Sequence, residues 1–299
     1  MRGPDNENLI VSLRDGRTVG YAAYGDPDGA PLLAFHGAPA CRLMFSIADK
    51  AARARGLRIV APDRPGYGLT PPDRDASLAA RAHWLALFAD AVGLKRFRLL
   101  GVSGGAPYAV ALAGLLPDRV SGLALVSPMG PVAEYQSSAN GTDRPLAFSH
   151  RGLFLHTSGH LWMTVPAGGL LSLMVRIAPE AFLGLGVRFF GGADAALFSR
   201  PEVKAYFTSM LREAFRQGAY GGTSDLAIYG RPWNVDFERV NMPAIVWQGT
   251  DDRIVPPQAA QYLAGLLAQC SYVPIKGAGH FWVLEHIWEV ITAIGELSH

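Results

Sequence analysis

Cysteine and charged residues are both scarce in this sequence. Its 299 residues include two cysteines, Cys41 and Cys270, so no disulfide framework beyond one bridge can form, and no zinc-type spacing exists. We expect two reduced, buried thiols. Charged residues make up 17% of the chain, and 27 basic against 25 acidic residues leave a net charge of +2. A balance this even gives no reason to expect nucleic acid or an anionic membrane as a partner.

Long apolar runs and targeting signals are also missing. The most apolar stretch, Leu161–Val175, contains Pro166 and two glycines. It is shorter than the roughly 18 residues expected of a membrane span. Residues 1–8 include Asp5 and Glu7 and no apolar run, unlike a secretory signal peptide. We therefore expect a cytoplasmic protein without a membrane span. The apolar fraction of 49% is sufficient for a large globular core.

The pattern of short apolar runs predicts an α/β fold. Residues 9–24 alternate around Asp15-Gly16, which predicts a β-hairpin. Further apolar runs between turn residues predict strands buried on both faces of a sheet, at 31–35, 57–61, 98–102, 122–126, 244–248 and 271–275. Helical segments alternate with them at 44–55, 77–92, 106–116, 259–267 and 282–297. We expect a mostly parallel sheet with helices on both faces.

This alternation stops between residues 131 and 232. The region has helical runs at 181–190 and 203–217 and no clear buried strand. We interpret 131–232 as a helical lid inserted into one domain, whose α/β core comprises residues 1–130 and 233–299. The lid is rich in large apolar residues that could line a pocket: Trp162, Met163, Leu170, Leu171, Met174, Phe182, Phe189, Phe190, Phe207 and Phe215.

A Gly-x-Ser-x-Gly pattern centred on Ser103 lies between a predicted strand and a predicted helix. In that context the pattern is typical of a sharp, strained turn that lifts the serine hydroxyl above the sheet. Glycine at Gly101 and Gly105 removes side chains where strand and helix pack closely. The helix N-terminus directs unpaired N–H groups toward the serine. We predict that Ser103 is a nucleophile.

A serine nucleophile needs a base, and the base needs a carboxylate that fixes its tautomer. His280 follows the last predicted strand on a loop that contains glycine, which suits a base approaching Ser103 from the far end of the sheet. After the strand at 244–248, Asp251 and Asp252 compete for the acid role. We favour Asp252 and expect Asp251 to be a turn residue. The chain order serine, aspartate, histidine fits such a fold.

An oxyanion that develops on the substrate needs two hydrogen-bond donors. We assign one to the backbone N–H of Gly104, directly after the nucleophile. The second is expected in the loop after the strand at 31–35, and we assign it to the N–H of Ala38, because Pro39 has no N–H. His36 in the same loop is expected to tie the loop to a neighbour.

Five motifs in this order resemble the α/β-hydrolase superfamily, in its esterase-like branch with a helical lid. They are His36-Gly37 with Pro39, the segment 63–68 (Asp-Arg-Pro-Gly-Tyr-Gly), the turn at Ser103, the acid turn at 249–256 and Gly279-His280. By this likeness, segment 63–68 shapes the mouth of the site. Asp225 and Trp233 resemble the segment where such lids rejoin the core, and we expect both to be structural.

The resemblance implies a serine hydrolase that acts on a small-molecule substrate without metal or organic cofactor. A carboxylesterase of small or medium, largely apolar acyl esters is the leading hypothesis. C–C bond hydrolases, proline iminopeptidases and perhydrolases share the constellation and stay open, as does a non-catalytic ligand-binding protein. Haloalkane dehalogenases and epoxide hydrolases carry aspartate where this chain has Ser103.

Three further residues are candidates for contact with substrate. Phe281 and Trp282 adjoin the base and could form a wall of the pocket, and Arg42 could bind a substrate carboxylate. The sequence leaves the oligomeric state open, a homo-oligomer included.

Overall fold

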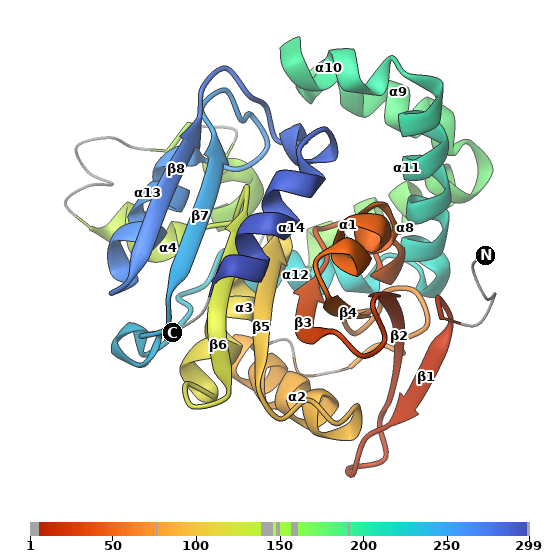
Figure 1. Ribbon diagram of the computed structural model, residues 1–299. Coiled ribbons are helices and arrows are strands. Elements are labelled where there is room, and N and C mark those ends of the chain that lie inside the picture. Colours follow the sequence, from red (N-terminus) through yellow and green to blue (C-terminus); the bar gives the residue numbers. More distant parts are fainter. Residues whose placement is uncertain are drawn as a thin grey trace.

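The computed structural model describes residues 6–73, 75, 77–138, 146–147, 150–156, 161–190 and 192–297. An eight-stranded sheet runs through it (Figure 1). In spatial order its strands are β1 (Leu9–Ser12), β2 (Thr18–Gly25), β4 (Leu57–Pro62), β3 (Ala30–Phe35), β5 (Phe97–Val102), β6 (Val120–Val126), β7 (Ala244–Gly249) and β8 (Cys270–Ile275). Strands β1 and β2 pair antiparallel, β2 pairs antiparallel with β4, and all other pairs are parallel. The predicted α/β fold with a mostly parallel sheet is confirmed.

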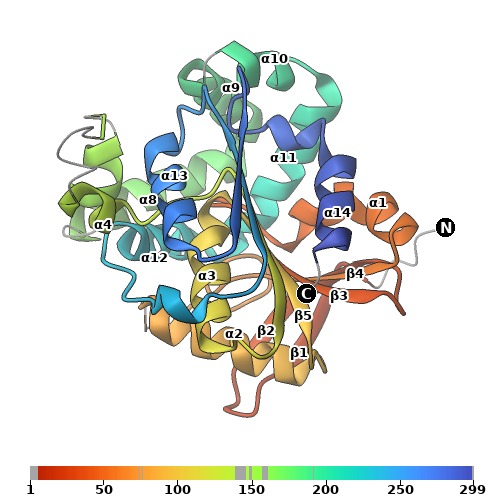
Figure 2. The same cartoon turned by 60° about the vertical axis from the view of Figure 1, so that its left-hand side comes forward.

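Helices cover both faces of this sheet, as Figures 1 and 2 show together. One face packs against α2 (Leu78–Ala91), α3 (Ala106–Leu115) and α13 (Pro257–Leu266), and the other against α1 (Asp49–Ala54) and α14 (Ile287–Glu296). Alternate strand residues point to opposite faces. Thus Leu99 packs on the α3 side and Leu100 on the α14 side.

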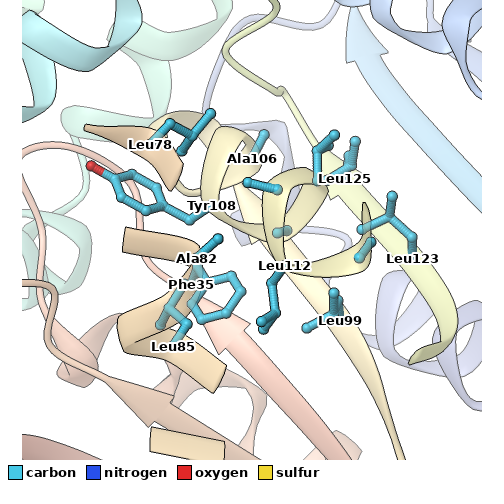
Figure 3. Packing of buried hydrophobic residues seen from close by; sticks show 14 of the residues in the cluster. Phe35, Leu78, Ala82, Leu85, Leu99, Ala106, Tyr108, Leu112, Leu123 and Leu125 are labelled. Atoms are coloured by element: carbon cyan, nitrogen blue, oxygen red, sulfur yellow. The ribbon is translucent and has the colours of Figure 1, made fainter. Parts of the chain in front are cut away.

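The core on the α3 side is built from leucine and aromatic side chains. Figure 3 shows Phe35 of β3 and Leu99 of β5 against Leu112 of α3 and Leu85 of α2. All four are fully buried. Each side chain of this kind contributes about 1.5–3 kcal/mol through burial. This packing holds the ends of β3 and β5 rigidly beside each other.

Several predicted elements differ from the observed ones in detail. The predicted helix 44–55 is a 3₁₀ helix at Arg42–Ala48 followed by α1, and 282–297 is a 3₁₀ turn at Trp282–Leu284 followed by α14. Strand β8 was expected to be buried on both faces, but it lies at the sheet edge and its residues are half-buried or exposed. Ser77 caps α2, because its side chain accepts a hydrogen bond from the Ala80 N–H.

Between β6 and β7 the described residues form helices and no strand. We call this set the inserted helices: α4 (Val132–Ser137), a π-helix (Arg151–His156), α8 (Leu161–Ile177), α9 (Pro179–Phe190), α10 (Gly192–Phe198), α11 (Pro201–Ala214), a 3₁₀ turn (Phe215–Gln217) and α12 (Tyr220–Tyr229). In both views α9 and α10 lie at the end of the molecule away from the β1–β2 hairpin (Figures 1 and 2). No helix in the described ranges combines the length and hydropathy needed to cross a bilayer.

Candidate active site

Ser103 sits on a strained turn at the carboxyl end of β5. The chain leaves the strand at Val102, forms a 3₁₀ turn at Ser103–Gly105 and enters α3 at Ala106. Ser103 has a φ of 51°, which a residue other than glycine adopts at a cost of roughly 1–2 kcal/mol. A Cβ at Gly105 would collide with the Phe35 carbonyl of β3, so the close packing of the turn requires glycine there.

The three predicted triad side chains lie together, all of them buried. His280 Nε2 is 3.0 Å from Ser103 Oγ, and His280 Nδ1 is 2.7 Å from Asp252 Oδ2. These lengths suit proton exchange between the hydroxyl and the imidazole, with a carboxylate behind the ring. The parallel strands explain the arrangement, because β5, β7 and β8 end at the same edge and the three residues follow those ends.

The acid turn distinguishes Asp252 from its neighbour. Asp252 Oδ1 accepts the backbone N–H groups of Ile254 at 2.8 Å and Val255 at 3.0 Å, and Oδ2 also accepts from Gln248 Nε2 at 3.0 Å. Asp251 is exposed, and its carboxylate receives the Thr250 hydroxyl at 3.0 Å. The geometry therefore joins Asp252, and not Asp251, to the histidine.

The surroundings of this pair shift both ionisations toward the charged forms. Burial alone would raise the pKa of Asp252, but the His280 charge and the hydrogen bonds from His280, Val255 and Ile254 outweigh it and lower the pKa. Burial alone would lower the pKa of His280. The charge and hydrogen bond of Asp252 and the charge of Asp194 outweigh that effect and raise the pKa. The site is thus built to stabilise an imidazolium at His280.

The two backbone segments assigned to the oxyanion hole adjoin each other next to Ser103. A Cβ placed on Gly104 would lie 3.1 Å from the Ala38 Cβ, and one placed on Gly37 would lie 3.4 Å from the Ser103 Cβ. Ala38 follows β3 and Gly104 follows β5, and these strands are hydrogen-bonded neighbours. Both segments therefore border the space in front of the serine hydroxyl.

A buried ion pair fixes the loop that carries Ala38. Arg64 donates to the carbonyl oxygens of His36 and Gly37, in the latter case at 3.1 Å, and its guanidinium pairs with Asp225 of α12 at 2.6 Å. The Arg64 N–H donates to His36 Nε2 at 3.2 Å, so His36 Nδ1–H donates to the Gly37 carbonyl at 2.8 Å. Burial and the Arg64 charge hold the pKa of His36 well below its usual range. Asp225 and His36 thus have the structural contacts expected from the sequence.

Two apolar pockets meet at Ser103. The histidine-side pocket, of about 300 Å³, is lined by His280 and Phe281 and by inserted-helix residues that include Phe182, Phe207 and Met210. The glycine-side pocket, of about 480 Å³, is lined in part by Gly104, Leu171, Phe215, Leu226 and Tyr229. Ala38, Pro39, Ser103 and Ile254 belong to both pockets. No lysine, arginine, aspartate or glutamate lies among the described residues that line them.

Of the other lid residues proposed to line a pocket, Leu170 faces solvent, with 63% of its surface exposed. Met174 lines neither pocket. The side chains of Trp162, Met163, Phe189 and Phe190 lie outside the described part of the structure.

Phe281 lies in the wall of the histidine-side pocket, where its ring meets Phe198 and Phe207 edge-on at 5.0 and 5.3 Å. The expectation for Trp282 is corrected, because this ring lies in the core beneath α14 and its Nε1–H donates to Ser127 Oγ at 3.1 Å. It lines neither pocket.

Arg42 also lies away from both pockets, which corrects its expected role as a carboxylate-binding residue. It is 1% exposed, and its guanidinium pairs with Asp63 at 2.8 Å and Glu213 at 2.7 Å. Its Nε also donates to the Glu7 carbonyl at 2.5 Å and its Nη2 to Asn8 Oδ1 at 2.5 Å. With its donors engaged in this way, Arg42 joins the N-terminal segment and α11 to the core.

Two residues at the site were missed by sequence reasoning. The Tyr229 hydroxyl donates to the Gly104 carbonyl at 2.9 Å, and the Asp194 carboxylate accepts the His280 N–H at 2.7 Å. Both come from the inserted helices. Asp194 lies in a segment without a recognisable motif, whereas Tyr229 lies between Asp225 and Trp233, in the segment that resembles the point where such lids rejoin the core. Within the described ranges, no group of three or more His, Cys, Asp or Glu side chains is arranged to hold a metal ion.

Comparisons with known proteins agree with this architecture. The chain is 26% identical to a non-heme chloroperoxidase of Streptomyces lividans over 92% of this chain and 94% of that protein. It is 25% identical to a haloalkane dehalogenase of Mesorhizobium japonicum, over 93% and 86%. With a 2-hydroxymuconate semialdehyde hydrolase of Pseudomonas putida the identity is 26%, over 87% and 83%.

Among solved structures, an esterase from Exiguobacterium antarcticum superposes with a TM-score of 0.70 over 97% of this chain and 99% of that one. At 18% identity this likeness concerns the fold. Residues 30–287 match the family described as the alpha/beta hydrolase fold. The chain therefore belongs to the alpha/beta hydrolase family and is a hydrolase enzyme.

Proposed function

We propose that this enzyme is a serine carboxylesterase acting on small, uncharged esters with an apolar group on each side of the ester bond. One observation carries the proposal. A strained serine, 3.0 Å from a carboxylate-backed imidazole, lies where two apolar pockets meet.

The positions of the side chains support the following reaction. His280 takes the proton of the Ser103 hydroxyl through Nε2 while the oxygen attacks the ester carbonyl carbon. Negative charge moves to the carbonyl oxygen, which receives the N–H groups of Ala38 and Gly104. The C–O bond of the ester then breaks, and His280 gives its proton to the departing alcohol. Water, activated by the same imidazole, releases the acid and restores Ser103.

The two pockets have different roles in this scheme. The departing alcohol oxygen must reach His280 Nε2, and His280 lines the histidine-side pocket alone. The alcohol group therefore occupies that pocket of about 300 Å³. The acyl group lies beyond the oxyanion donors, in the glycine-side pocket of about 480 Å³ bordered by Gly104. Because the acyl pocket is the larger of the two, we expect it to admit larger groups than the alcohol pocket.

The apolar linings favour neutral substrates. A substrate ammonium or carboxylate in either pocket would lose its hydration without a counter-ion, which costs several kcal/mol. This disfavours an iminopeptidase, whose substrate carries an amine. The strained conformation and hydrogen bonds of Ser103 disfavour a purely ligand-binding protein, because such strain is retained where it serves chemistry.

C–C hydrolysis is a second candidate, favoured by the similarity to the Pseudomonas putida hydrolase. It uses the same nucleophile and differs in the leaving group. The serine at position 103 also fits it better than dehalogenation, since the resemblance assigns aspartate to that position in dehalogenases.

The decisive experiment is activity profiling of purified protein. A fluorophosphonate probe is expected to label the wild type at Ser103 and to leave Ser103→Ala unlabelled. A panel of esters, amides and diketones should show highest kcat/KM for the neutral esters. Absence of labelling in folded wild-type protein would refute the nucleophile. If the probe labels Ser103 but the enzyme hydrolyses only the diketones of the panel, we would assign it as a C–C bond hydrolase.

A further inference from the structure

Asp194 connects the inserted helices directly to the catalytic histidine. It lies in α10, and 1% of its surface is exposed. Its Oδ2 accepts the backbone N–H of His280 at 2.7 Å, and its Oδ1 accepts that of Phe281 at 2.9 Å. One carboxylate thus holds two successive peptide groups of the loop after β8. In Figure 2, α10 lies at the same end of the molecule as the loop that follows β8 and carries His280.

The sequence of the loop is matched to this contact. A Cβ at Gly279 would collide with both oxygens of the Asp194 carboxylate. Glycine directly before His280 is therefore required for the carboxylate to reach the two N–H groups. The glycine of the Gly279-His280 motif is thus explained by its contact with Asp194, which lies 85 residues earlier in the chain.

The charge of Asp194 also bears on the imidazole. Each carboxylate oxygen accepts an N–H, the bonding pattern of an ionised acid. No lysine or arginine forms an ion pair with it among the described residues. In the part of the chain that the structure describes, the charged groups that face His280 are Asp252, from the turn after β7, and Asp194, from α10. Ser103 faces the imidazole as a neutral hydroxyl, and the Ser127 hydroxyl donates to the backbone carbonyl of His280.

We propose that Asp194 is a positioning residue, which anchors the backbone of His280 so that its ring spans Ser103 and Asp252 and whose charge stabilises the imidazolium formed during proton transfer. This role rests on the proposed serine chemistry. It makes α10 part of the catalytic apparatus, because the base is held in place from the inserted helices as well as from the core.

Asp194→Asn tests the proposal at nearly constant volume. The amide oxygen can accept one of the two N–H groups, while its NH₂ faces the other donor and the charge is removed. We expect kcat to fall on the order of 10- to 100-fold, the cost of a small misplacement of a catalytic group, with little change in KM. The acidic limb of kcat/KM should also move to lower pH, because a charge that favours the imidazolium is gone.

Arg200→Gln is the matched control. Arg200 pairs with Glu285 at 2.6 Å, which also joins the inserted helices to the segment after His280, but both side chains are about half exposed. Exposed pairs of this kind contribute little. We expect kcat, KM and the pH profile of this variant to match the wild type.

A second readout is independent of ester turnover. ¹³C-labelled histidine, with His280 assigned by comparison with His280→Gln, allows the imidazole to be titrated by NMR. The pKa of His280 is expected to be lower in Asp194→Asn than in the wild type. The smaller Asp194→Ser, expected to show the same shift, serves where the Asn variant does not fold. An unchanged pKa together with unchanged kcat would overturn the role of Asp194. If the wild type hydrolyses no ester but the pKa of His280 is still lower in Asp194→Asn than in the wild type, only the esterase assignment is overturned.

Discussion

Replacing Asp252 with asparagine should disable the site while leaving its shape intact. The carboxylate makes four hydrogen bonds: Oδ1 accepts from the N–H groups of Ile254 and Val255, and Oδ2 accepts from Gln248 and faces His280 Nδ1. All four partners donate to it. An asparagine has one acceptor oxygen and one donor NH₂ group, so it cannot satisfy both sides.

The side chain must choose between two unfavourable arrangements. If the NH₂ faces Ile254 and Val255, two buried N–H donors lose their acceptor, at about 1–3 kcal/mol each. If it faces His280, Nδ1 must become the acceptor and the proton moves to Nε2. An Nε2 that carries a proton cannot take one from Ser103. The second arrangement leaves one donor, Gln248 Nε2, without its acceptor instead of two, so it is cheaper. We therefore expect the inactive tautomer and a loss of kcat on the order of 10³- to 10⁴-fold, about 4–5 kcal/mol in activation free energy.

The assay is kcat/KM for a p-nitrophenyl ester, with thermal unfolding as a check of the fold. Asp251→Asn is the matched control: it makes the same chemical change at the adjacent, exposed position, and we expect less than a twofold effect. Equal and severe losses in both variants would refute the assignment of the acid. A loss under tenfold for Asp252→Asn would refute the tautomer argument itself.

Three further outcomes follow from the same geometry. Ser103→Gly should have a free energy of unfolding about 1 kcal/mol higher than that of Ser103→Ala, seen in calorimetry as a higher unfolding temperature, because glycine adopts a φ of 51° without strain; equal stabilities would contradict the strain. The wild-type kcat/KM should fall as pH drops through a midpoint above 6.5, because Asp252 and Asp194 outweigh burial and raise the pKa of His280, and only the neutral imidazole accepts a proton; a midpoint below 6.5 would count against this. Leu226→Trp should raise KM tenfold or more for long acyl chains and spare long alcohols, with the reverse for Met210→Trp. This selectivity is measured with two ester panels, one varied in the acyl chain and one in the alcohol. If Leu226→Trp affected long alcohols and Met210→Trp long acyl chains, the assignment of the two pockets would be reversed.

The features that sequence predicted well are those with local signals. Short apolar runs between turn residues located the strands, and Gly101-x-Ser103-x-Gly105 between strand and helix located the turn whose positive φ the structure shows. Because parallel strands end at one edge, the approximate positions of Asp252 and His280 followed from the strands before them. The order of elements therefore carried most of the information about the site.

The features that sequence could not supply depend on distant partners. Nothing near Arg42 indicates that Asp63 and Glu213, the latter 171 residues away, would surround its guanidinium and remove it from the pocket. Trp282 was ambiguous because an aromatic ring beside a catalytic base can face either substrate or core. Asp194 gave no signal because its partners are backbone N–H groups, which every residue except proline possesses.

The inserted helices contact three parts of the proposed active site. Asp194 holds the loop of the proposed base, His280. Asp225 pairs with Arg64, which fixes the loop of the proposed oxyanion donor Ala38, and both side chains of this pair are at most 2% exposed. Removing one partner from such a pair leaves a buried charge uncompensated, at about 3–5 kcal/mol. Tyr229 adds a third connection through the Gly104 carbonyl. The proposed base, oxyanion loop and nucleophile turn each contact a different inserted residue. We therefore expect changes in these helices that alter specificity to preserve the three contacts and to fall at pocket-lining side chains such as Met210 and Leu226.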